Sequence, residues 1–147
     1  MTKEQMIKDI EYAIHYHEDQ MYKIEQLLNC VAIENPTAIA KSQCKLGQWL
    51  YTEENHLLEI LGEQFYNKME QTHAQWHIEY IKIHKIFFPK EKKGFFASLV
   101  NSRKVDPLEV DKAKLYYTEL QKTTTELLHA LASSNRRVHA MNESKFF

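Results

Sequence analysis

The sequence predicts an all-α protein, an antiparallel four-helix bundle with a short extra helix that carries a cysteine motif. The chain of 147 residues contains only three Gly and three Pro, which are too few for the turns of an all-β fold. Three long stretches place apolar residues at alternating spacings of three and four, the pattern of helices with one buried face. This length and pattern predict one domain spanning residues 1–147.

Charge and composition exclude several classes of function. The formal net charge is -1, with Lys and Arg interspersed among Asp and Glu, so no basic face points to a nucleic acid. The N-terminus is polar where a secretory signal needs an apolar run, and no stretch approaches the ~20 apolar residues of a membrane span. We therefore expect a cytoplasmic protein without a membrane span. In that compartment Cys30 and Cys44 are expected to be thiols or metal ligands rather than a disulfide.

The first predicted helix has a histidine in its apolar face. Seven positions, called its seam here, follow one another at spacings of three and four: Ile7, Ile10, Ile14, His17, Met21, Ile24 and Leu28. His15 lies two residues from His17, which turns it by roughly 200° around the helix and places it on another face. A single buried histidine is more often a hydrogen-bonded core residue than a ligand. His17 alone therefore leaves both interpretations open.

A short helix is expected around the cysteine motif. The first helix must end before Asn35-Pro36-Thr37, because the residue before a proline is pushed out of the helical conformation. Beyond this loop, Ser42 is the expected N-cap of a helix carrying residues 44–51. Gly47 inside that helix costs about 1 kcal/mol relative to Ala, which predicts close approach of another backbone or of a site.

The second long helix, after a turn or kink at Gly62, again has a histidine in its seam. The seam positions are Tyr66, Met69, His73, Trp76, Tyr80, Ile83 and Phe87. His77 lies four residues beyond His73, a separation that lets two imidazoles converge on one ion. Such a pair is common by chance. Here it accompanies a seam histidine in the first helix and a cysteine between the two helices, which together indicate a buried metal site.

A closing helix is expected over residues 107–140. It begins with Asp106 as N-cap and Pro107 at the first helical position. Its seam contains no histidine and consists of Val110, Ala113, Tyr117, Leu120, Thr124, Leu127, Leu131, Ser134 and Val138. His129 and His139 lie off this seam and are expected at the surface. The helix is therefore predicted to close the bundle without contributing a metal ligand.

Three of these stretches resemble a known family. Residues 13–17 (Ala-Ile-His-Tyr-His), 44–51 (Cys-Lys-Leu-Gly-Gln-Trp-Leu-Tyr) and 73–77 (His-Ala-Gln-Trp-His) are similar to the chemoreceptor zinc-binding (CZB) domain. The resemblance implies a four-helix bundle that binds one Zn²⁺ through three histidines and one cysteine. Carried onto this chain, the ligands are His17, Cys44, His73 and His77. The seam and the resemblance independently favour His17 over His15.

The resemblance is strong over residues 5–87 and looser in the closing helix. It implies the cytoplasmic sensory part of a chemoreceptor or a diguanylate cyclase, and a homodimer. We expect a stand-alone member without an attached signalling or output domain, which acts on such a signalling protein or through self-association. The basic, partly apolar connection over residues 90–104 is expected to form a short helix packed on the bundle end or an exposed contact patch.

The predicted ligand chemistry favours zinc and disfavours catalysis. Thiolate and imidazole ligands suit Zn²⁺, whereas Mg²⁺ and Ca²⁺ prefer oxygen. Four protein ligands leave no position for a reacting water, and Ala74 stands where the metalloprotease pattern His-Glu-x-x-His needs Glu, so we do not expect an enzyme.

Three functions remain open at this point. They are a regulatory module that responds to zinc or to oxidation of its ligand cysteine, a helical interaction protein with a purely structural zinc, and a metalloenzyme. Zinc affinity separates the first two, because a sensor must exchange zinc in the range that the cell varies. For a redox response Cys44 is preferred, since Cys30 lies outside the first seam and is expected to be an inert thiol rather than a resolving cysteine.

Overall fold

The computed structural model confirms the all-α fold. It describes residues 1–33, 36–89 and 105–146, so the expected connection over residues 90–104 lies outside the described residues. The helices are α1 (Lys3–Leu28), α2 (Lys45–Tyr51), α3 (Leu57–Leu61), α4 (Glu63–Phe87) and α6 (Pro107–Ala140), with single 3-10 turns η1 (Glu53–Asn55) and η2 (Glu143–Lys145). The described ranges contain no strand. Within them, none of the helices combines the length and apolarity that a membrane span requires.

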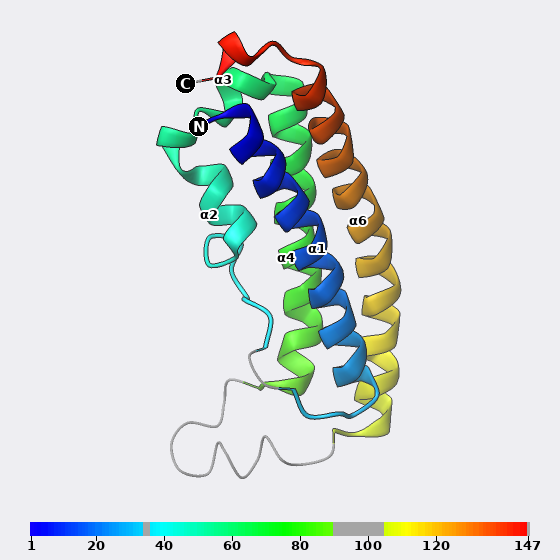
Figure 1. The fold of residues 1–147 in the computed structure, drawn as a ribbon. Coiled ribbons are helices and arrows are strands. Elements are labelled where there is room, and N and C mark those ends of the chain that lie inside the picture. The colour runs from blue at the N-terminus through cyan, green and yellow to red at the C-terminus, as the bar shows by residue number, and fades with distance from the viewer. Residues whose placement is uncertain (34–35, 90–104, 147) are drawn as a thin grey trace.

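Successive segments of the bundle run in opposite directions. The chain descends α1, returns upward through a loop and α2, descends α4 and ascends α6 (Figure 1). Side-chain contacts agree with this order. The Lys3 ammonium donates hydrogen bonds of 2.8 Å to the carbonyls of His139 and Met141, whereas Thr124 contacts the Met21 sulfur at 3.1 Å. The short helices α2 and α3 therefore take the second position of an antiparallel bundle.

Local sequence signals set the starts of the long helices. At α1, the Thr2 hydroxyl accepts a hydrogen bond of 3.1 Å from the Gln5 backbone N–H. At α6, the Asp106 carboxylate accepts one of 2.8 Å from the Leu108 N–H, and proline occupies the first helical position as predicted. The kink expected before α4 is present, because Gly62 has φ +88°, which other residues rarely adopt.

The seams predicted for α4 and α6 form much of the core. Their fully buried members are Met69, His73, Trp76, Tyr80, Ile83, Ala113, Leu120, Thr124, Leu127, Leu131, Ser134 and Val138. The remaining four are half-buried, and three of them pack against this core: Tyr66, Phe87 and Tyr117, with Val110 as the fourth half-buried member. The three-four spacing therefore located the buried faces of these two helices.

The buried face of α1 is wider than its predicted seam. Ile10, His17 and Ile24 are fully buried as expected, but Ile7, Ile14 and Met21 are only half-buried. Met6, Ala13, Gln20 and Leu27 are buried instead. The reason is that α1 packs between α6 on one side and the α2 segment on the other, so two adjacent stripes of the helix are covered.

The α2 segment begins differently from the prediction. Ser42 is not its N-cap; Cys44 occupies that position with an extended backbone, φ -74° and ψ 141°. A Cβ added at Gly47 would lie 1.7 Å from the Lys41 carbonyl oxygen, so the chain before α2 crosses the helix at Gly47 and cannot start the helix at Ser42. The expected close approach of another backbone to Gly47 is confirmed.

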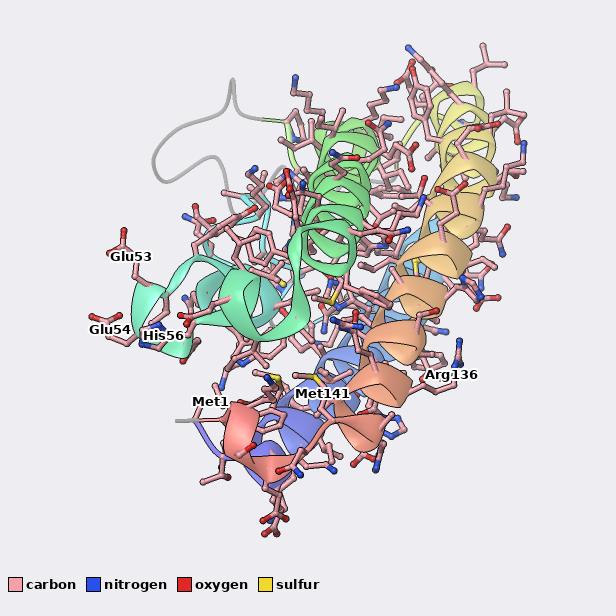
Figure 2. The ribbon with its side chains drawn as sticks, turned by 90° about the horizontal axis from the view of Figure 1, so that it is seen from above. Met1, Glu53, Glu54, His56, Arg136 and Met141 are labelled. Atoms are coloured by element: carbon pink, nitrogen blue, oxygen red, sulfur yellow. The ribbon has the colours of Figure 1, made fainter. Side chains whose placement is uncertain are left out.

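The chain then makes an exposed corner between α2 and α3. His56, between η1 and α3, has a left-handed backbone with φ 52°. Figure 2 shows Glu53, Glu54 and His56 projecting together at this corner, on the side of the molecule away from Arg136 of α6. The corner reverses the chain so that α3 leads into α4.

Candidate metal centre

Four side chains from three segments of the bundle converge in the core. His17 comes from α1, Cys44 from the N-cap of α2, and His73 and His77 from adjacent turns of α4. One possible ligand atom of each lies within 4.8 Å of those of the other three. All four residues are buried, with His17 and His73 at 0% exposure and Cys44 at 1%. The structure thus brings together every residue for which the sequence predicted a metal ligand.

The distances within this group suit a small tetrahedral ion. The Nε2 atoms of His73 and His77 are 3.1 Å apart, and the Cys44 Sγ lies 3.9 Å from the His17 Nε2. With Zn–N bonds of about 2.0–2.1 Å and a Zn–S bond of about 2.3 Å, tetrahedral geometry gives ~3.3 Å between two nitrogens and ~3.6 Å between nitrogen and sulfur. These two distances therefore suit a zinc ion bound by the group.

Backbone carbonyls orient two of the imidazoles. The Nδ1 atoms of His17 and His77 lie 2.9 Å from the carbonyl oxygens of Ala13 and Ile39, respectively. Donation to a carbonyl requires the proton on Nδ1, which leaves the Nε2 lone pair of each ring facing the group. Within the described residues, the Nδ1 of His73 is buried and has no hydrogen-bond partner. The His77 Nε2 carries a lone pair and lies 3.1 Å from the His73 Nε2. Either a proton on the His73 Nε2 or a shared cation must therefore lie between these two nitrogen atoms.

Burial keeps the three imidazoles neutral. Desolvation lowers the pKa of His17 to about 4, and desolvation together with the neighbouring His17 and His77 lowers the pKa of His73 to about 2. The pKa of His77 is also lowered, again mainly by desolvation. Neutral imidazole is the form that binds metal ions, so at neutral pH these rings are ready to coordinate.

Opposing effects act on the pKa of the Cys44 thiol. Burial raises its pKa, while the nearby backbone N–H groups of Leu46 and Gly47 and the Tyr16 hydroxyl act in the opposite direction. Burial and the adjacent Cys44 also raise the pKa of Tyr16 to about 12, so its O–H stays a donor at physiological pH. A cation at the group would favour the thiolate.

The comparisons with known proteins agree with this geometry. Residues 17–83 match the family described as the chemoreceptor zinc-binding domain, CZB. Over this segment the chain is similar to that family. The match begins at His17 and includes Cys44, His73 and His77, so all four grouped residues lie inside the matched segment. Comparisons with curated proteins and with solved structures returned no match.

A tryptophan links the group to the closing helix. The Trp76 ring contacts the rings of His17 and His77 edge-on, at centroid distances of 5.2 and 4.9 Å. Its Nε1–H donates a hydrogen bond of 2.8 Å to the Thr124 hydroxyl of α6. The helix α6 therefore supplies no member of the group but fixes the ring against which two of the imidazoles pack.

A carboxylate ties both ends of the cysteine segment to α4. Glu70 Oε1 accepts hydrogen bonds of 2.8 Å from the Lys41 ammonium and 2.7 Å from the Tyr51 hydroxyl, an arrangement called the Glu70 clamp here. The hydrogen bond from Lys41 is the main cause of the lowered pKa of Glu70. The clamp thus holds the residues before and after Cys44 close to the turn of α4 that precedes His73.

The other histidines lie outside the group. His129 and His139 are exposed, as predicted, and His15 and His56 are exposed as well. His84 is buried but packs against the rings of Tyr80 and Phe88, further along α4. Sequence reasoning missed the supporting residues Ile39, Lys41 and Glu70. Spacing gives no signal for them, because their roles depend on how the loop before α2 crosses α4.

Proposed function

We propose that the CZB domain of this chain binds one zinc ion through His17, Cys44, His73 and His77. The observation that carries this proposal is the buried group of three imidazoles and one thiol whose possible ligand atoms lie within 4.8 Å of one another. When bound, zinc supplies the positive charge that stabilises the thiolate and shares the lone pairs of the imidazoles. The proposal assigns no reaction to the centre, because four protein ligands fill a tetrahedral coordination sphere.

We further propose that the centre is regulatory and responds to zinc availability or to oxidation of Cys44. Three of the four residues lie on the long helices α1 and α4, whereas Cys44 lies at the start of a helix of 7 residues. Losing the bond to Cys44 would therefore free one short segment while the long helices stay packed. A segment that is docked in one state and released in the other is the kind of two-state element on which a switch can act.

An oxidant such as peroxide would act directly on the sulfur. Attack by the Cys44 thiolate forms an S–O bond and breaks the O–O bond; the sulfur loses two electrons, and the peroxide accepts them and leaves as hydroxide. The product is a sulfenic acid, which has lost the thiolate charge that favours zinc. Cys30 is exposed and stands outside the group, and we propose that it is not a ligand.

The wider context is also proposed from the family and the chemistry. A thiolate ligand requires a reducing compartment, which supports a cytoplasmic location. The packing of α6 on α4 and α1 supports a single domain over residues 1–147. As expected for a CZB protein, the partner is a chemoreceptor, a diguanylate cyclase or another signalling protein, or a second copy of the chain.

Competition against a chromogenic chelator tests both levels of the proposal. One zinc per chain is expected in the parent protein and in the control Cys30→Ser, with much weaker binding in Cys44→Ser. An affinity within reach of cellular zinc fluctuation supports the sensor, whereas zinc that chelators cannot remove from the folded protein supports a purely structural role. Binding of zinc by Cys44→Ser with parental affinity would refute the assigned ligand set.

A further inference from the structure

A buried threonine joins the loop before α2 to both α1 and α4. The Thr37 hydroxyl donates a hydrogen bond of 2.6 Å to the Oε1 of Gln20 on α1. The Thr37 carbonyl accepts one of 3.3 Å from the hydroxyl of Tyr80 on α4. All three residues are buried, with Thr37 and Gln20 at 4% exposure and Tyr80 at 0%. These three residues are called the Thr37 anchor here.

The anchor differs from the other connections between the cysteine segment and the bundle. The Glu70 clamp lies partly in water, since the side chains of Lys41 and Glu70 are 44% and 24% exposed, and solvent screens such a pair. The connection through Cys44 depends on the ion. The anchor contains no proposed ligand, and its hydrogen bonds are shielded from water. Breaking them would leave buried polar atoms unpaired, which is costly with or without an ion.

We propose that the Thr37 anchor stays in place when zinc leaves and forms the fixed end of the segment that the proposed switch releases. The moving part then begins between Thr37 and Cys44 and ends before α3, whose apolar residues are buried in the core. The inference deepens the proposed function and rests on it, because it assumes that zinc binds Cys44. It defines where the released segment begins.

Such an anchor keeps Cys44 within reach of the other three ligands. Thr37 and Cys44 are seven positions apart (44 − 37), which a fully extended chain spans in at most ~25 Å. Without the anchor, the tether would begin at the end of α1 at Leu28 and span 16 positions (44 − 28). Because a longer loop is entropically costlier to close, the local concentration of Cys44 would fall roughly threefold. The anchor therefore favours recapture of zinc.

The shorter hydrogen bond of the anchor can be removed without changing the size of the side chain. Thr37→Val replaces the hydroxyl by a methyl group and takes this donor from the Gln20 Oε1, whereas Thr37→Ser keeps the hydroxyl. Thr72→Val is the matched control. Thr72 is also buried, at 5% exposure, but its hydroxyl lies against the carbonyls of Lys68 and Met69 within its own helix.

Backbone order parameters from ¹⁵N relaxation test the proposal on the full chain, with zinc and after its removal by a chelator. Removing zinc from the parent should lower the values of Lys45–Tyr51 below about 0.6, typical of flexible backbone, while Thr37 and Ala38 stay near the rigid value of about 0.85. In zinc-free Thr37→Val, Ala38 should become flexible too. Thr37→Ser and Thr72→Val should match the parent. Chelator competition should give Thr37→Val a zinc affinity roughly threefold lower than that of the other three proteins.

The possible outcomes separate this inference from the function on which it rests. Loss of order at Thr37 in the zinc-free parent would overturn the anchor, and this result needs no variant. A zinc-free Thr37→Val that keeps Ala38 rigid would also overturn it, because the hydrogen bond to Gln20 would not be what holds the loop. Both results leave the zinc centre intact. If Lys45–Tyr51 stayed rigid in the zinc-free parent, the proposed switch would be refuted and the inference with it. A parent that binds no zinc would refute the centre itself.

Discussion

Replacing Gly47 by alanine should damage the proposed zinc centre although the residue binds nothing. In an unobstructed helix, Gly→Ala stabilises by about 1 kcal/mol. Here the new Cβ would lie 1.7 Å from the Lys41 carbonyl oxygen and 3.3 Å from the His73 Cε1. Since ordinary contacts lie between 3.4 and 4 Å, either Lys41 or α2 must move by well over 1 Å. Overpacking of this kind costs about 1–3 kcal/mol or more, so the clash outweighs the gain in helix propensity.

The same displacement should weaken zinc binding, because α2 carries Cys44 at its start. We expect the metal-free Gly47→Ala protein to melt about 2–6 °C below the parent, and its zinc affinity to fall roughly 100-fold. Circular dichroism melting and chelator competition measure the two effects. Gly62→Ala is the control: its φ of +88° strains an alanine, but the nearest atom to the new Cβ is the Arg137 Nη2 at 3.8 Å.

Gly62→Ala should therefore lose stability and keep parental zinc affinity. The reasoning would be refuted if Gly47→Ala bound zinc as tightly as the parent and melted no lower. It would also be refuted if Gly62→Ala weakened zinc binding as much as Gly47→Ala, since the effect would then follow from general destabilisation rather than from the crossing of Lys41 over α2.

Three further predictions concern the same core. His17→Ala should weaken zinc binding strongly while His15→Ala should not, as chelator competition can measure; the reverse result would contradict the seam argument. Glu70→Gln removes the negative charge that pairs with Lys41, so zinc release should become severalfold faster. Stopped-flow transfer of zinc to a chelator measures this rate. An unchanged rate would show that the Glu70 clamp does not hold the cysteine segment. In the metal-free protein, the folded pKa values of about 4 for His17 and about 2 for His73 lie below the unfolded value of 6.5. As the pH falls, the unfolded chain therefore binds more protons than the folded protein does. The free energy of unfolding should be at its maximum above pH ~6.5 and lower at pH ~5 by about 1–2 kcal/mol for each of these histidines. Urea unfolding at the two pH values measures this loss, and equal midpoints would contradict neutral burial of the imidazoles.

The sequence predicted most of the fold because long amphipathic helices obey a simple period. The spacing of three and four placed His17 and His73 on buried faces, and both are fully buried. The approach of Cys44 to them came from resemblance, since no local pattern says how a short segment docks. The start of α2 was wrong for a related reason: Ser42 is a good N-cap by propensity, but the contact between Lys41 and Gly47 is non-local and overrides it.

The supporting contacts could not be predicted from the sequence either, because they too are non-local. The Ile39 carbonyl that orients His77 belongs to a loop, and any residue would offer the same oxygen. Glu70 lies on α4 among other polar residues, and only the fold brings Lys41 and Tyr51 to it. Helix periodicity reports which face is buried, whereas these roles depend on the path of the backbone between helices.

The order of the grouped residues along the chain also implies a time order during synthesis. All four lie between positions 17 and 77, whereas α6 ends at residue 140, which is 63 positions later (140 − 77). At about 5–20 residues per second, the ribosome needs roughly 3–13 s to add those residues. Every proposed ligand therefore exists on the nascent chain seconds before the helix that supports Trp76 is complete. On the proposed function, metal binding and the docking of α6 are therefore separable steps of biogenesis.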